Sequence, residues 1–233
     1  MKLGILNTDA VKPEFAQKYG EYPDMFAEIL IATDPQLKLV TYEVVEGEYP
    51  ADINEVDGYL ITGSKLSVYD DVPWINDLKD FVRALNETKK KVIGICFGHQ
   101  LVAEALGGKT EPAVIGWCVG AHLNKATEIA KGYGIKDAEF QLPSNHKDQV
   151  TTLPTGGKLL ASTDACPIAA IGVGDHILTF QGHPEFGLGY ATDLLNMRRE
   201  IIGEVSYQTA ISSLETKTDN LKVARWILEF INR

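Results

Sequence analysis

A cysteine and a histidine–glutamate pair supply the residue types that nucleophilic catalysis requires. Cys96 lies in the run GICFGHQ at residues 94–100, directly after the apolar segment 91–95 and directly before a helical pattern at 101–106. This order predicts a sharp strand-to-helix turn, with glycines on both sides of the thiol that permit a tight turn and a close substrate approach. A helix that begins just after Cys96 favours the thiolate, because its first turn has unpaired N–H groups and a partial positive charge. The alternative is a small buried cysteine that packs like a hydrophobe at a strand end.

The run QGHPE at residues 181–185 contains a base and an acid two positions apart. Side chains at i and i+2 of an extended chain point to one side, and Pro184 favours an extended conformation at His183. Glu185 can then hold one imidazole nitrogen while the other nitrogen faces a thiol, as in a Cys-His-acid triad. The alternative is a surface histidine beside a turn proline. With the turn around Cys96 upstream, the triad is the favoured interpretation.

These two motifs, together with two further segments, resemble the class I, triad-type glutamine amidotransferases. The run at 94–100 is similar to the family's cysteine motif, and the run at 181–185 to its His-Pro-Glu motif. Residues 57–64 (DGYLITGS) resemble the family's oxyanion strand, and residues 144–150 (SNHKDQV) resemble a segment that reads Ser-His-Gly-Asp in relatives. The four segments follow the family's order, and the resemblance covers about residues 1–190.

The resemblance implies a role for each matched residue. Cys96 would be the nucleophile, His183 the base and acid, and Glu185 the group that orients His183. The backbone N–H groups of Gly63 and Phe97 would form an oxyanion hole, where donors stabilise charge that develops in the transition state. The side chains expected to bind substrate are Gln100, Ser64, Asn145 and His146.

Two departures from the family pattern lie on the substrate side. Residues 62–65 read TGSK where many relatives have Gly-Gly-Pro, and Lys147 stands where a glycine is common. The loop at 65–71 follows the expected oxyanion glycine and should border the mouth of the pocket. Its polar groups could hold an amino acid or a short peptide, and a solvated loop is an equal alternative; these groups are Lys65, Tyr69, Asp70 and Asp71.

The resemblance implies cysteine-dependent hydrolysis of a γ-glutamyl amide through a thioester. Glutamine is the favoured substrate, with its amide supplying ammonia, since the chain resembles a stand-alone amidotransferase domain of the GMP synthetase kind. A synthetase partner protein is then expected, because one domain uses up the 233 residues and no glycine-rich ATP loop is present. One alternative is a γ-glutamyl peptidase that acts on glutathione-like conjugates. Another is a non-catalytic regulatory module, against which the intact set of Cys, His and Glu argues.

Other residues with reactive side chains are predicted to have structural roles. Cys118 and Cys166 lack a strand-to-helix turn and are expected to be inert. His146 and Asp148 would lie on one side of a strand, but no third metal ligand is near them in the sequence, so no metal is expected. His99 is expected to pack or to face solvent beside the site, and no cofactor is predicted.

Composition and charge exclude several classes of partner. The chain has 32 acidic and 22 basic residues, a formal charge of −10, whereas nucleic-acid binders have basic patches. No apolar run approaches the roughly 18 residues that span a bilayer, and the start MKLGIL is too short for a signal peptide. Three cysteines without metal-ligand spacing suit a reducing compartment. We therefore expect a cytoplasmic protein without nucleic-acid or membrane partners.

Short apolar runs alternate with amphipathic helical segments through the first half of the chain. The expected elements are strands at residues 3–6, 38–45, 58–62 and 92–95 and helices at 25–33, 74–85 and 101–106. This alternation predicts an α/β fold with a mostly parallel central sheet and helices on both faces, as in flavodoxin-like folds. Ligands of such sheets bind at the carboxyl ends of the strands, where Gly63 and Cys96 both fall.

The second half of the chain has a different pattern. Residues 113–164 are less periodic and rich in turns, which predicts a small antiparallel extension, and residues 169–180 return to the sheet. The tail at 188–233 is typical of two or three helices. The last helix is expected at 220–231, with one apolar face made of Leu221, Ala224, Ile227, Leu228 and Ile231. With 45% hydrophobic residues and no linker or repeat, residues 1–233 are expected to form one domain.

Overall fold

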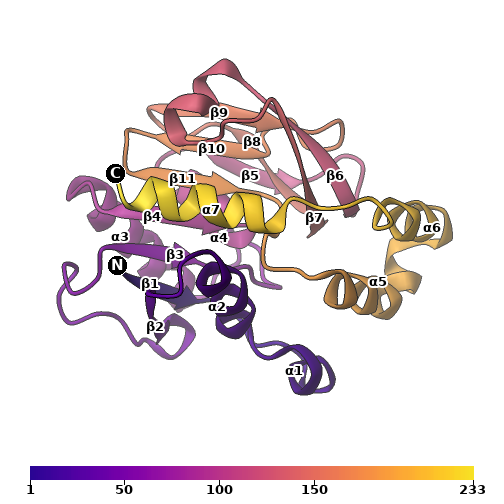
Figure 1. Ribbon diagram of the computed structural model, residues 1–233, viewed down its shortest axis with the longest axis horizontal. Coiled ribbons are helices and arrows are strands. Elements are labelled where there is room, and N and C mark those ends of the chain that lie inside the picture. Colours follow the sequence, from indigo (N-terminus) through magenta and orange to yellow (C-terminus); the bar gives the residue numbers. More distant parts are fainter.

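The computed structural model describes all residues from 1 to 233, and a mixed sheet of nine strands forms its centre (Figure 1). The parallel strands are β1 (Lys2–Asn7), β2 (Lys38–Glu43), β3 (Gly58–Ile61), β4 (Lys91–Ile95) and β11 (Ile177–Phe180). The antiparallel strands are β6 (Cys118–Ala126), β7 (Glu139–His146), β9 (Gly157–Ser162) and β10 (Ala170–Val173). The strand order is β2-β1-β3-β4-β11-β10-β9-β6-β7.

The α/β fold with a partly parallel sheet is confirmed, and its antiparallel part is larger than expected. The four strands of residues 118–173 join the central sheet because β10 pairs with β11 in a hairpin and so continues the sheet beyond β11. Only β5 (Lys109–Pro112) and β8 (Asp148–Thr152) lie outside it, as a separate two-stranded ribbon.

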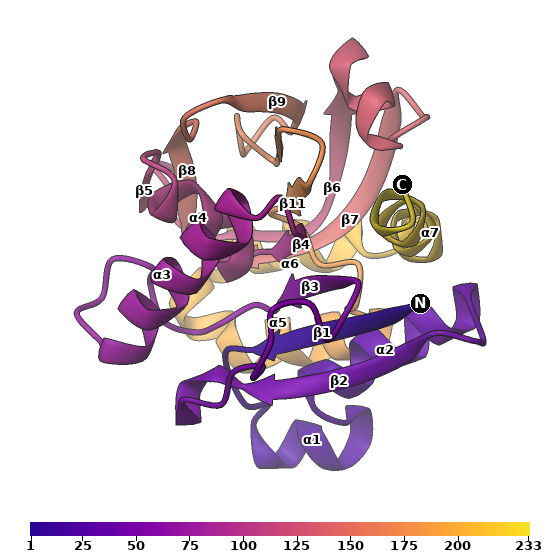
Figure 2. The same ribbon diagram turned by 90° about the vertical axis from the view of Figure 1, so that its left-hand side faces the viewer.

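Helices cover both faces of the parallel strands. The helices are α1 (Pro13–Tyr19), α2 (Tyr22–Thr33), α3 (Pro73–Glu87), α4 (Phe97–Ala105), α5 (Leu188–Ile202), α6 (Glu204–Ser213) and α7 (Asn220–Ile231). In Figure 2, α3 and α4 lie on one side of the strands and α7 on the other, where it packs against α2. Figure 1 shows α5 and α6 at the end of the molecule beyond β7. None of these helices combines the length and the apolar composition that crossing a bilayer requires.

Four local features differ from the sequence expectations. The strand expected at 38–45 ends at Glu43, because residues 44–46 form a 3-10 turn (η1, Val44–Glu46) closed by a glycine with positive φ. The short helix α1 was not expected. A second 3-10 segment, η2 (Glu128–Tyr133), follows β6. In α7, Leu221 is exposed while Val223, Trp226 and Phe230 are buried, because this helix packs on both the sheet and η2.

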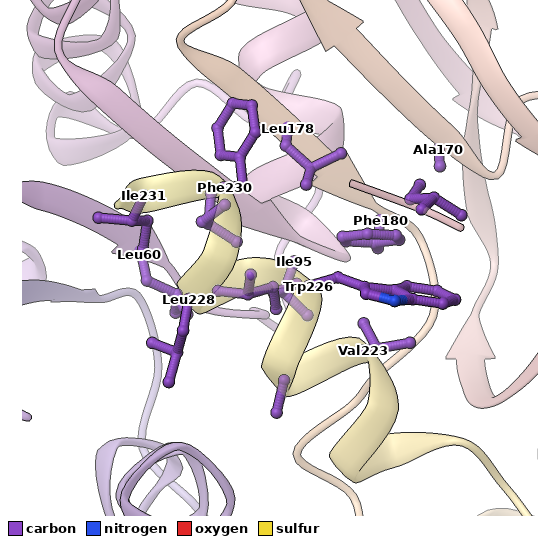
Figure 3. Close-up of a cluster of buried hydrophobic side chains, with 14 of the residues drawn as sticks. Leu60, Ile95, Ala170, Leu178, Phe180, Val223, Trp226, Leu228, Phe230 and Ile231 are labelled. Atoms are coloured by element: carbon purple, nitrogen blue, oxygen red, sulfur yellow. The ribbon is translucent and has the colours of Figure 1, made fainter. Parts of the chain in front are cut away.

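The core has one large cluster on each face of the sheet, and these clusters meet around Cys96. Figure 3 shows Trp226 of α7 near Ile95 and Phe180, and Phe230 of α7 belongs to the same buried cluster. Ile95 is fully buried in this cluster, whereas Phe97 is buried in the cluster on the opposite face. Burial of a side chain of this size stabilises the fold by about 1.5–3 kcal/mol. The residues on both sides of Cys96 are therefore anchored in opposite layers, and the backbone between them has a fixed direction.

Candidate active site

Cys96 occupies a strained turn between β4 and α4. Its φ of 52° and ψ of −100° place it in the left-handed region, which costs a residue with a side chain about 1–3 kcal/mol. Gly94 and Gly98 have no positive φ, so they do not make the turn as the sequence suggested. A Cβ atom on Gly94 would lie 2.6 Å from the carbonyl oxygen of Gly98, and one on Gly98 would lie 2.6 Å from that of Ile61. The glycines therefore let α4 pack closely on the strand ends.

Unpaired backbone N–H groups lie beside the thiol. Phe97 is the first residue of α4, where an N–H has no acceptor within the helix. Gly63 follows β3, and its N–H makes no backbone hydrogen bond. A Cβ atom on Gly63 would lie 3.7 Å from Cβ of Cys96 and 3.2 Å from Cε1 of His183. These N–H groups match the expected oxyanion hole in position, and that role stays a prediction.

His183 and Glu185 contact each other, and both are buried. Nδ1 of His183 lies 2.8 Å from Oε1 of Glu185, whereas Nε2 of His183 is buried without a hydrogen-bond partner. The chain between them is a turn rather than the extended segment that Pro184 suggested, and the N–H of Phe186 donates to the carbonyl of His183. The side-chain amide of Asn220 donates to the carbonyls of Pro184 and Phe186, at 2.7 and 2.9 Å, and so holds this turn against the start of α7.

The charge of His183 depends on its two neighbours. Burial by itself lowers the pKa of the His183 imidazole, but the negative charges of Glu185 and Cys96 outweigh burial and raise that pKa to about 10. The imidazole is therefore protonated at neutral pH. The ring of Phe186 stacks on it, with ring centroids 3.9 Å apart and an interplanar angle of 5°. A positively charged, oriented imidazolium beside a thiol is the arrangement that activates a cysteine nucleophile.

The other cysteines and His99 lack these features. Cys118 and Cys166 are buried, and burial raises the pKa of each thiol to about 12, so neither is a thiolate at neutral pH. His99 is fully buried and packed, not solvent-facing, with Nδ1 2.8 Å from the hydroxyl of Thr179. Burial lowers the pKa of His99 to about 3, which keeps the ring neutral.

His146 and Asp148 lie close together without forming a metal site. Nδ1 of His146 donates to the carbonyl of Asp148 at 2.8 Å, and burial lowers the pKa of His146 to about 3. No group of three or more His, Cys, Asp or Glu side chains is arranged to hold a metal ion. The neutral His146 ring thus leaves Nε2 as a hydrogen-bond acceptor at the pocket.

Of the polar groups in the loop at 65–71, Lys65 lines the pocket. Tyr69 and Asp70 do not line the pocket. The hydroxyl of Tyr69 donates to the Asp148 carboxylate at 2.9 Å, and Asp70 accepts the N–H of Ser67 at 2.9 Å. The Asp148 carboxylate also accepts the Ser67 hydroxyl, at 2.5 Å. These bonds satisfy the polar groups and fasten the loop to β8.

One pocket collects most of the predicted site residues. Its lining includes Gly63, Ser64, Cys96, Gln100, Asn145, His146 and His183. The Gln100 amide donates to the carbonyl of Asp148 at 2.8 Å, and the Ser64 hydroxyl accepts the N–H of Leu66 at 3.3 Å. Phe97 and Glu185 are buried outside the lining, as expected for a backbone donor and for a group that acts through His183.

Several lining residues were missed by sequence reasoning. Phe186 among them stacks on His183, and Tyr22 stacks on Phe186 in turn; the full set is Tyr22, Trp117, Phe186, Leu194 and Arg198. Arg198 had a detectable signal, because it lies four residues from both Leu194 and Ile202, on the buried stripe of α5. A charged side chain on an apolar stripe is unfavourable to bury unless it has a binding partner. Trp117, in a turn-rich loop, offered no such signal.

Comparisons with known proteins give consistent results. The model of the family "Glutamine amidotransferase class-I" matches residues 23–198. The chain is 33% identical to a glutamine amidotransferase-like protein of Schizosaccharomyces pombe, over 98% of both chains. It is 31% identical to gamma-glutamyl peptidase 3 of Arabidopsis thaliana, over 87% of this chain and 85% of that protein.

Two further comparisons concern length and fold. The chain is 32% identical to a GMP synthase of Bacteroides fragilis, over 74% of this chain but only 32% of that protein. A solved glutamine amidotransferase of Thermotoga maritima has the same fold, with a TM-score of 0.79 at 15% identity and 99% coverage of both chains.

Proposed function

Because the chain belongs to the class I glutamine amidotransferase family, we propose that it is a cysteine-dependent γ-glutamyl hydrolase that acts on γ-glutamyl peptides. One observation supports this most strongly. Cys96 stands on a strained turn near the buried His183–Glu185 pair, and Cys96 and His183 both line one pocket. Packing alone requires none of these residue types at these positions, which also argues against a non-catalytic module.

Acylation begins from a thiolate on Cys96 and an imidazolium on His183. The sulfur attacks the γ-carbonyl carbon, and the N–H groups of Gly63 and Phe97 stabilise the oxyanion that forms. The carbon–nitrogen bond then breaks as Nε2 of His183 gives its proton to the departing amine. A γ-glutamyl thioester remains on Cys96, and the free amine leaves the pocket.

Deacylation reverses the proton transfers. Neutral His183 takes a proton from water, and the resulting hydroxide attacks the thioester carbonyl. The carbon–sulfur bond breaks, glutamate leaves, and the thiolate and imidazolium are restored. The net reaction consumes one water for each amide bond. Glu185 holds Nδ1 of His183 through both steps and stabilises its positive charge.

The choice of γ-glutamyl peptides reverses the preference for glutamine that the sequence favoured. The Arabidopsis relative named a gamma-glutamyl peptidase matches this chain along most of both lengths, whereas the match to the GMP synthase covers a third of that protein. The pocket lining also includes the large side chains of Tyr22, Trp117 and Arg198. Ammonia, the leaving group from glutamine, needs no such lining, but an amino acid or a peptide does.

A second candidate is hydrolysis of glutamine with transfer of ammonia to a synthetase partner. The family model and the GMP synthase relative favour it. The two candidates differ in the product released. The purified protein is therefore incubated with glutamine and, separately, with γ-glutamylglycine, while ammonia and glycine are measured.

The proposed function predicts a higher kcat/KM for γ-glutamylglycine than for glutamine, with no turnover of either by Cys96→Ala. A higher kcat/KM for glutamine would favour the ammonia donor instead. Turnover of the dipeptide that persists in Cys96→Ala would end the thiol mechanism.

A further inference from the structure

Arg198 is a half-buried cation without an acidic partner. It makes no ion pair, whereas its neighbour Arg199 pairs with Glu204 at 2.6 Å. Its guanidinium carbon lies 5.0 Å from the centre of the Trp117 ring, and one of its five N–H donors contacts the side-chain oxygen of Asn145. The remaining donors have no acceptor in the protein.

The position of Arg198 explains why an acceptor is expected. It lines the pocket from α5, on the stripe that buries Leu194 and Ile202. Burial is the main influence on the pKa of Arg198 and lowers it, and no carboxylate contacts the guanidinium, although the charge of Asp9 acts on it from a distance. A planar guanidinium in this state is suited to bind a carboxylate through two parallel hydrogen bonds.

Arg198 lies on the leaving-group side of the pocket. His183 must face the departing nitrogen in order to protonate it, so the amine half of a substrate extends along the wall beside His183. Phe186 stacks on His183, Tyr22 stacks on Phe186, and Trp117 with Arg198 over its ring lines the same pocket. Gly63 lies beside both His183 and Cys96, where the reacting carbonyl would sit, and we assign the γ-glutamyl half to the part of the pocket lined by Gln100.

Building on the proposed function, we propose that Arg198, stacked on Trp117, binds the carboxylate carried by the amine half of a γ-glutamyl peptide. The enzyme would then select peptides with a free C-terminal carboxylate over the corresponding amides. Two lysines also line the pocket, but they are less suited to bind this carboxylate. Lys65 is paired with Asp9 at 2.7 Å, and Lys147 is exposed at the mouth.

The test measures binding and turnover of γ-glutamylglycine and γ-glutamylglycinamide. Calorimetric binding is measured on protein with Cys96→Ala, which holds the peptide without cleaving it, so that the result does not depend on turnover. In this background we expect the acid to bind about 10- to 100-fold more tightly than the amide, the equivalent of one charged hydrogen-bonded contact. Adding Arg198→Gln should remove that preference and leave the affinity for the amide unchanged.

Matched variants separate this role from structural effects. Arg199→Gln removes the same charge from the next position of α5 and should keep the preference, and Arg198→Lys should keep part of it. Equal losses of affinity for acid and amide in Arg198→Gln would overturn the proposal, because Arg198 would then act through Asn145 on the γ-glutamyl half. Loss of the preference in Lys147→Gln instead of Arg198→Gln would also overturn it. Absence of turnover by the wild type, with the acid still preferred in binding, would count against the proposed function alone.

Discussion

The two walls of the pocket are built in different ways. Gly63 and Cys96 lie on the wall made by the carboxyl ends of the parallel strands, where backbone N–H groups and a strained turn supply the proposed chemistry. Trp117 and Arg198 lie on the wall made by a loop and α5, and they contribute only side chains. Changes on the first wall should therefore affect the rate of bond cleavage. Changes on the second wall should affect which substrate is bound.

The largest effect is expected at the nucleophile. Cys96→Ala should lower kcat/KM by about 10⁴-fold or more, because the remaining groups act only together with the thiol. The melting temperature should stay close to that of the wild type, since alanine loses little packing at this turn. Cys118→Ala is the matched control, and it should keep nearly full activity. A similar loss in both variants would place the effect in the fold rather than in the thiol.

The next effect is expected at the oxyanion glycine. Gly63→Val should lower kcat by about 100-fold or more, the scale seen when one oxyanion donor is lost. Its new side chain would press on His183 and Cys96, and Gly63 has no positive φ that a side chain would strain. Gly132→Val, at a glycine with open space around it, is the control for kinetics and melting. Unchanged kcat in Gly63→Val would show that the oxyanion hole is elsewhere.

A smaller effect, with a pH signature, is expected at Glu185. Glu185→Gln should lower kcat/KM by about 10- to 100-fold, the equivalent of a charged hydrogen bond. In the wild type, His183 stays protonated up to a pKa of about 10, so kcat/KM should fall as the pH rises through that value. Without the charge of Glu185, burial lowers the pKa of His183, and the alkaline limb should move to lower pH. If the alkaline limb of the pH profile does not move in Glu185→Gln, Glu185 does not control the charge of His183.

The smallest effect is expected at Asn220, which positions the turn of His183 from α7. Asn220→Ala removes two hydrogen bonds, worth about 0.5–1.5 kcal/mol each. We expect kcat to fall about tenfold or less with KM unchanged, because the substrate contacts are kept. Asn232→Ala, an exposed asparagine at the other end of α7, is the control. If KM rises and kcat does not change, Asn220 acts on the substrate pocket instead.

The proposed catalytic residues were largely predictable from sequence, because each motif that contains them is a short run of neighbouring residues. Cys96 lies within a run that contains both the strand end and the helix start, and His183 and Glu185 are only two positions apart. Even there, the sequence suggested the wrong local cause. Gly94 and Gly98 serve close packing, and Cys96 itself takes the strained conformation.

The second wall could not be predicted, because its residues meet only through tertiary structure. Tyr22, Trp117 and Arg198 come from three distant segments, and the antiparallel strands that place Trp117 show weak periodicity. The direction of Tyr69 was left open for a related reason. A polar side chain in a loop beside a pocket can face either the pocket or the protein, and the distant Asp148 decides that it faces the protein.

Trapping the acyl intermediate tests the central claim most directly. Wild-type protein is mixed with γ-glutamylglycine, quenched in acid during turnover, and digested for peptide mapping by mass spectrometry. We predict one γ-glutamyl group on the peptide that contains Cys96, and none on Cys118, Cys166 or any residue of the Cys96→Ala protein. Sustained release of glycine without a γ-glutamyl group on Cys96, or with the group on another residue, would contradict the thioester mechanism.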